Sequence, residues 1–435
     1  MADVSFRELT GGAGCSILSA NPGPDLPSHG YRENEYAASG SVDGGVPFCT
    51  RVLVRRPVDD AAFNGTLVVE WLNVSSGADG APDYTYLAEE LVRGGYAWAG
   101  VSAQYTGIEG GPGSVAGLDD PGAQRLADKD PERYGGLHHP GDAYCHQIFG
   151  ALGDALRSTA YGQPITGLTV RQVLAVGESQ SAMALTTYAN HHAAQHGVFD
   201  GILIHSRSAA EMPLGKPGRA IDIDTVFDLE PTTIGDDLGI PVLMVQTETD
   251  VLTNFGFHRA RQSNSDTVRT WEIAGTSHAD QFQIGPYESM LGCPTPVNRG
   301  QQRFVLRAGL RHLAAWAAGG TPPPIATPLA VATDDGTAYF VHDDVGNATG
   351  GVRSPCVDAP TEVMSGVVTG DDVPRICVLF GSTTPIPGEQ LRQRYLDADD
   401  YLAQYTKATD RMIADGFATA EDRDELLADA RPDLI

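Results

Sequence analysis

The pattern of apolar and polar positions alternates between two kinds of segment along most of the chain. Apolar runs with the length of buried strands cover residues 66–72, 96–102, 173–176, 201–204, 241–245 and 268–273. Segments with helical spacing lie between several of them, as where Ile148, Leu152 and Leu156 recur every four residues. Strands that alternate with helices predict an α/β fold with a mostly parallel, doubly wound sheet. Residues 1–60 are predicted instead to form antiparallel strands joined by turns.

Two long stretches without periodicity interrupt this alternation, at residues 104–139 and 206–237. Loops of this length are uncommon in compact domains unless they are functional, so we expect both to shape a pocket. A proline-rich run at residues 321–324 marks a boundary. We therefore predict a core over residues 1–320 with two insertions, followed by a C-terminal extension over residues 321–435.

The most informative stretch joins a buried strand to a helix. Its apolar run leads into Gly177-Glu178-Ser179-Gln180-Ser181, which is close to the G-x-S-x-G nucleophile elbow. Such a turn raises the serine hydroxyl above the edge of the sheet and directs backbone N–H groups toward a developing oxyanion. Ser181 departs from the pattern, although serine is the next smallest polar residue. In a chain rich in Gly and Ser such a match also arises by chance, so the partners of Ser179 decide its meaning.

Ser179 needs a base and an orienting acid, which are expected on loops after later strands. Residues 268–273 lead to His278, the candidate base, and the strand before them leads to Glu248 and Asp250. The chain order Ser179, Asp250, His278 is the order found in enzymes with this elbow. Asp250 fits the usual offset from the strand better, and Glu248 remains the alternative acid.

An oxyanion hole needs two hydrogen-bond donors. One is expected from the backbone N–H of Gln180, directly after the nucleophile. The second is expected from Asn73 or Val74, in the loop after residues 66–72, and the spacing does not decide between them. Asn73 has an alternative role, in which its side chain holds the turn.

Four residues near the expected site are predicted to line a substrate pocket, namely Trp71, Tyr84, Tyr105 and His205. The three aromatic side chains favour an apolar or aromatic acyl or alcohol group, and core positions are their alternative. His205 either lines the pocket or is a hydrogen-bonded structural histidine.

Composition and charge narrow the range of partners. The formal net charge of −27 argues against nucleic acid or an anionic membrane, since both need a basic surface. No apolar run approaches the roughly 18 residues of a membrane helix. The six cysteines form no C-x-x-C pair or Cys/His cluster, so we expect no metal, and free buried thiols. The N-terminus lacks signal-peptide features, which favours a cytoplasmic location and leaves a secreted mature form and the oligomeric state open.

These motifs together resemble the α/β-hydrolase superfamily and, more narrowly, a bacterial family of alpha/beta hydrolase domains. The resemblance is carried by residues 69–75, 133–144, 177–181, 247–250, 274–280 and 350–355. Because these stretches span most of the chain, the resemblance implies that residues 321–435 belong to the same unit and pack on the core. It also implies the α/β-hydrolase fold and a Ser–acid–His hydrolase.

The leading hypothesis is a cofactor-free serine hydrolase that cleaves a small-molecule carboxylic ester, lactones included, through an acyl-enzyme. An acyltransferase would use the same acyl-enzyme, and exclusion of water by the loops would distinguish the two. A non-catalytic binding scaffold is the second alternative, because a fold does not determine a function. The Ser, acid and His in the required order argue against it.

Overall fold

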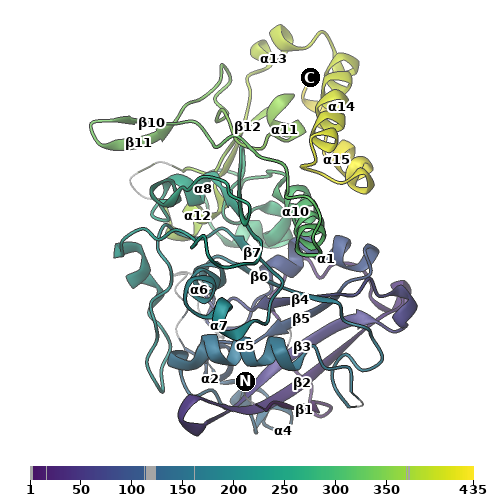
Figure 1. Cartoon of the computed structure of the whole chain (residues 1–435). Coiled ribbons are helices and arrows are strands. Elements are labelled where there is room, and N and C mark those ends of the chain that lie inside the picture. The colour runs from purple at the N-terminus through teal and green to yellow at the C-terminus, as the bar shows by residue number, and fades with distance from the viewer. Residues whose placement is uncertain are drawn as a thin grey trace.

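A large mixed sheet forms the centre of the molecule (Figure 1). The computed structural model describes residues 3–15, 17–111, 113, 124–160, 162–368, 370 and 373–435. Within these residues nine strands form one sheet, in the order β1-β2-β3-β5-β4-β6-β7-β8-β9. Their bounds are β1 (Ser5–Glu8), β2 (Tyr31–Val42), β3 (Val46–Pro57), β4 (Thr66–Trp71), β5 (Ala97–Val101), β6 (Gln172–Glu178), β7 (Gly201–His205), β8 (Val242–Thr247) and β9 (Val268–Ile273).

Strand direction divides this sheet into two parts. Strands β1, β2, β3 and β5 pair antiparallel in that order. From β5 through β4, β6, β7 and β8 to β9 every pairing is parallel. The prediction of a mostly parallel sheet with antiparallel N-terminal strands is confirmed. The carboxyl ends of the parallel strands therefore meet at one edge, where ligands bind in open α/β sheets.

Helices cover both faces of the sheet (Figure 1). Their bounds are α1 (Pro82–Arg93), α2 (Tyr105–Glu109), α3 (Leu126–Lys129), α4 (Pro131–Tyr134), α5 (Cys145–Ala155), α6 (Gln180–Tyr188), α7 (Ala194–His196), α8 (Glu248–Leu252), α9 (Gln281–Ile284), α10 (Gln302–Ala317), α11 (Pro355–Asp358), α12 (Arg375–Phe380), α13 (Gly388–Arg394), α14 (Ala398–Ala414) and α15 (Arg423–Ala428). Two short antiparallel strand pairs are also present, β10 (Val331–Asp334) with β11 (Thr337–Phe340), and β12 (Glu362–Ser365) with β13 (Ser382–Pro385).

Side chains of each parallel strand point alternately to two apolar cores. In β6, Val173 and Ala175 join the core beneath α5 and α6, whereas Leu174 and Val176 join the core beneath α1 and α10. A strand that is buried on both faces needs apolar residues at successive positions. This explains why the sequence shows continuous apolar runs here.

Of the two predicted insertions, residues 112 and 114–123 of the first lie outside the described residues. The described remainder holds the short helices α2, α3 and α4. The second insertion holds a 3₁₀ helix, η7 (Ile223–Asp228). No helix within the described ranges is long and apolar enough to cross a membrane.

The C-terminal segment returns to the edge of the sheet. Val352 forms a parallel bridge with Ile273 at the end of β9. Further along, α10 and the last helices are joined by ion pairs, among them Arg307 Nη1 with Asp422 Oδ1 at 2.9 Å and Arg311 with Glu421 at 2.9 Å. The strands β1 to β3 lie at one end of the molecule and α13 to α15 at the other (Figure 1).

The expectation of free thiols is wrong for two cysteines. Cys293 and Cys377 form a disulfide, although they lie 84 residues apart in sequence. The remaining four are free; Cys145 is buried, and Cys15, Cys49 and Cys356 are partly buried. A bond between distant residues has no local sequence pattern, so the spacing of the cysteines could not show it.

Candidate active site

Ser179 occupies a sharp turn between β6 and α6. Its φ is 61° and its ψ is −119°, a conformation uncommon for a residue with a side chain. The turn is held from below by β7, because the Ser179 N–H donates to the His205 carbonyl at 2.9 Å. A Cβ at Gly177 would lie 2.9 Å from Leu185 Cδ1 and 3.0 Å from Ser181 Cβ. Position 177 therefore needs glycine, whereas the small Ser181 side chain is accommodated.

The three residues predicted as nucleophile, acid and base are brought together. Ser179 Oγ lies 2.8 Å from His278 Nε2, and His278 Nδ1 lies 2.7 Å from Asp250 Oδ1. Asp250 is on α8, directly after β8, and His278 is on the loop after β9. The His278 N–H donates to Thr249 Oγ1 at 3.1 Å, which ties the base loop to the acid loop.

The Asp250 carboxylate is held in one orientation. Its second oxygen, Oδ2, accepts hydrogen bonds from the backbone N–H and the hydroxyl of Thr247, both at 2.7 Å. Burial raises the pKa of Asp250, but His278 and the Thr247 donors outweigh burial, so the pKa lies below its ordinary value. The carboxylate is thus ionised and aimed at the imidazole.

Glu248, the alternative acid, contacts other groups. Its Oε1 accepts from the Gly275 N–H at 2.6 Å and its Oε2 from the Gly366 N–H at 2.9 Å. Burial raises its pKa to about 7, and the two backbone donors offset part of that effect. Glu248 therefore links its own segment after β8 to the loop after β9 and to the C-terminal segment, whereas Asp250 contacts His278.

The loop after β4 limits the choice of a second oxyanion donor. The Asn73 N–H already donates to the Gly80 carbonyl at 2.9 Å. Its side chain holds the loop, since Nδ2 donates to the Glu178 carbonyl at 3.1 Å and Oδ1 accepts from the Ser75 N–H at 2.8 Å. The backbone N–H groups of Val74 and Gln180 have no acceptor within the described residues.

Glu178, directly before the nucleophile, is a feature that the sequence analysis missed. Its Oε1 lies 3.3 Å from His278 Nε2, and Asn73 Nδ2 lies 3.4 Å from its Oε2. Burial raises the pKa of Glu178 well above its ordinary value, and the nearby carboxylates of Asp83, Asp250 and Glu70 add to this. The Glu178 carboxyl thus faces the base, and its surroundings favour the protonated form. The signal that could have indicated it is its position inside the elbow.

A cavity of about 850 Å³ opens in front of Ser179. Glu178, Ser179, Gln180 and His278 line it, and most of the other lining side chains are apolar. None of the four residues predicted to line a substrate pocket lines this cavity.

The aromatic residues of that prediction belong to the core or to another part of the surface. Trp71 packs on Phe149, with ring centres 4.8 Å apart; Tyr84 packs on Trp98 at 4.7 Å; and Tyr105 begins α2, edge-on to His139. His205 is fully buried and its Nδ1 lies 2.9 Å from Asp83 Oδ1. It is the hydrogen-bonded structural histidine of the second alternative.

Across the described ranges, no group of three or more His, Cys, Asp or Glu side chains is placed to hold a metal ion.

The fold agrees with the comparison to known families. The alpha/beta hydrolase domain family matches residues 6–428, and the chain belongs to it. No curated protein matches the sequence.

Several solved structures are similar in part. A putative dienelactone hydrolase from Klebsiella pneumoniae is 14% identical, over 65% of this chain and 98% of its own, with a TM-score of 0.34. A fungal esterase from Rhizomucor miehei is 12% identical, over 66% of this chain and 85% of its own, with a TM-score of 0.35. Est1E from Butyrivibrio proteoclasticus, bound to ferulic acid, is 10% identical, over 62% of this chain and 96% of its own, with a TM-score of 0.32. At such scores the likeness bears on neither substrate nor mechanism.

Proposed function

We propose that the protein is a serine hydrolase that cleaves small-molecule carboxylic esters through an acyl-enzyme. The observation that carries the proposal is the continuous hydrogen-bonded chain from Ser179 Oγ through His278 to Asp250, at 2.8 and 2.7 Å. A serine hydroxyl becomes nucleophilic when a base accepts its proton and an acid orients that base. The short serine–histidine distance supports catalysis over a binding scaffold.

In the acylation step, Ser179 Oγ attacks the ester carbonyl while His278 Nε2 accepts its proton. Asp250 keeps the other imidazole proton on Nδ1 and stabilises the imidazolium that forms. His278 then gives the proton to the departing alcohol. In deacylation a water molecule takes the place of Ser179 as nucleophile and the same proton transfers release the acid.

The oxyanion of each tetrahedral intermediate accepts hydrogen bonds from the N–H groups of Gln180 and Val74 in this proposal. The first N–H groups of a helix have no partner within the helix, and Gln180 is the first residue of α6. Asn73 is assigned a supporting role, because its own N–H and amide are engaged in holding the loop. Losing one such donor costs about 10²–10³ in rate in enzymes of this kind.

The disulfide bears on location. Disulfides persist in oxidising compartments and are rare in the cytosol. The Cys293–Cys377 bond therefore supports a proposed location outside the cytoplasm, in place of the cytoplasmic expectation.

Replacement of Ser179 by alanine tests the function. Hydrolysis of a short aryl ester such as p-nitrophenyl acetate should fall by about 10³-fold or more, because the covalent route is lost. Retention of full activity by Ser179→Ala would contradict the proposal. Analysis of the products in the presence of added alcohols distinguishes hydrolysis from acyl transfer.

A further inference from the structure

Apart from the residues around Ser179, most side chains that line the cavity are apolar. One wall is formed by residues 284–291 and another by residues 373–380, and Phe227 and Phe255 line it as well. Besides Glu178 and His278, the ionisable residues that line it are Tyr287 and Arg375. Arg375 is half-exposed and pairs with Asp224, with Nη1 3.2 Å from Oδ2, so its charge is already neutralised.

Apolar side chains are also exposed around this cavity. Leu18, Tyr287 and Met290 are 59%, 51% and 74% exposed, and all three line it. Apolar groups that stay in contact with water gain free energy when a ligand covers them. A neutral ligand with a large apolar part would contact the apolar walls and also cover the exposed apolar side chains.

We propose that the cavity takes esters with a large apolar acyl or alcohol group, and that the Cys293–Cys377 disulfide holds two of its walls together. The first half rests on the proposed ester hydrolysis at Ser179. The second half concerns the segment 284–291 and α12, which the disulfide connects.

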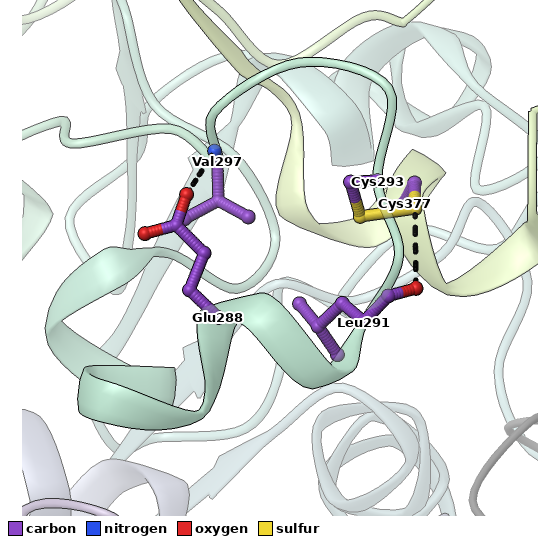
Figure 2. Close-up of a disulfide and its surroundings, with 5 residues drawn as sticks. All are labelled: Glu288, Leu291, Cys293, Val297 and Cys377. Atoms are coloured by element: carbon purple, nitrogen blue, oxygen red, sulfur yellow. Dashed lines mark hydrogen bonds between the residues drawn. A yellow bond between two sulfur atoms is a disulfide. The ribbon is translucent and has the colours of Figure 1, made fainter.

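The wall over residues 284–291 packs on the rest of the molecule through its two ends, where the partly buried Ile284 and Leu291 contact the cluster of Ala279, Val297 and Phe380. It consists mainly of the 3₁₀ helix η9 (Gly285–Met290), which has no buried residue. Figure 2 shows how it is held: the Glu288 carboxylate accepts from the Val297 N–H at 2.9 Å, and the disulfide joins the loop after η9 to α12. Segments with few buried contacts open readily, so a covalent link to a better-anchored element matters here.

Helix α12 is that better-anchored element. The carbonyl of Leu379 accepts from the N–H of Ala279 at 2.9 Å, and that of Phe380 accepts from Asn298 at 2.8 Å. Ala279 follows His278, so α12 is tied directly to the loop of the base. Through Cys377 the disulfide connects this anchored helix to the wall over residues 284–291.

The preference of the enzyme for acyl chains of different length tests both the substrate class and the role of the disulfide. The kcat/KM of the wild type for p-nitrophenyl esters should rise from acetate to octanoate, because each buried methylene is worth about fourfold. We expect a rise of at least about 30-fold. In Cys293→Ser/Cys377→Ser the octanoate-to-acetate ratio should fall at least about tenfold, and Cys356→Ser, which removes a thiol outside any disulfide, should keep it.

A second pair of variants keeps the test informative if the double cysteine variant does not fold. Met290→Glu places a charge on an exposed residue that lines the cavity. Leu396→Glu is the control, because it places a charge on a residue that is 92% exposed and does not line the cavity. The ratio should fall several-fold in Met290→Glu alone. An equal ratio in the two variants would overturn the assignment of substrate class.

The outcomes separate the claims. A wild type that prefers acetate, with hydrolysis that depends on Ser179, overturns the apolar substrate class and leaves the proposed function in place. A folded double variant with an unchanged ratio overturns the role of the disulfide. Hydrolysis that survives in Ser179→Ala overturns the proposed function itself.

Discussion

Replacing Asp250 with asparagine keeps the shape of the side chain and removes its charge. The structure dictates how the amide must orient. The position of Oδ2 faces the Thr247 N–H and hydroxyl, both at 2.7 Å, so the amide oxygen has to take that place. The amide NH₂ then faces His278 Nδ1 at the 2.7 Å contact and donates to it. This arrangement puts the imidazole proton on Nε2, where it cannot accept the proton of Ser179.

The expected loss follows from the wrong tautomer. Asp250→Asn should lower kcat by about 10³–10⁴-fold, as an Asp→Asn change does in serine proteases, equal to about 4–5.5 kcal/mol of transition-state stabilisation. Initial rates on p-nitrophenyl acetate measure it, with circular dichroism to verify folding. Glu248→Gln is the matched control, because Glu248 does not contact His278; it should lose less than about tenfold. An Asp250→Asn enzyme within tenfold of wild type, or an equal loss in the control, would refute this assignment of the acid.

Two further predictions concern the buried glutamates. Glu178→Gln should keep kcat/KM within about threefold near neutral pH, since the raised pKa of Glu178 favours a neutral carboxyl, which the amide mimics. A large loss, or a displaced pH–rate profile, would show that Glu178 is ionised. The pKa of Glu248 is about 7 in the folded state against 4.5 ordinarily, so the folded protein binds the extra proton between these values and stability falls as pH rises through that window. In urea denaturation, the free energy of unfolding of the wild type should fall by about 3 kcal/mol between pH 4.5 and pH 7, and that of Glu248→Gln should not show this fall. The same pH dependence in both proteins would contradict the prediction.

The positions of Ser179, Asp250 and His278 could be predicted because each directly follows a strand of one parallel sheet. Parallel strands place their carboxyl ends at a common edge, so chain order and strand ends suffice to bring the three together. Chain order and strand ends distinguish Asp250 from Glu248 as the acid only weakly. Glu248 and Asp250 leave the same strand, and the Gly366 N–H that engages Glu248 comes from a distant segment.

The lining of the cavity could not be predicted in this way. Its walls at residues 284–291 and 373–380 are joined by a disulfide that closes a long stretch of chain. Trp71 was placed near the site by its position at the end of β4. The alternation of side chains along that strand turns it into the core against Phe149 instead.

Covalent capture is the most direct test of Ser179 as an activated nucleophile. A fluorophosphonate probe reacts with a serine that a neighbouring base has activated, and intact-mass spectrometry with peptide mapping locates the adduct. We expect one adduct per chain, on Ser179, and none in Ser179→Ala or after denaturation. An unlabelled wild type, or an adduct on another serine that Ser179→Ala retains, would contradict it.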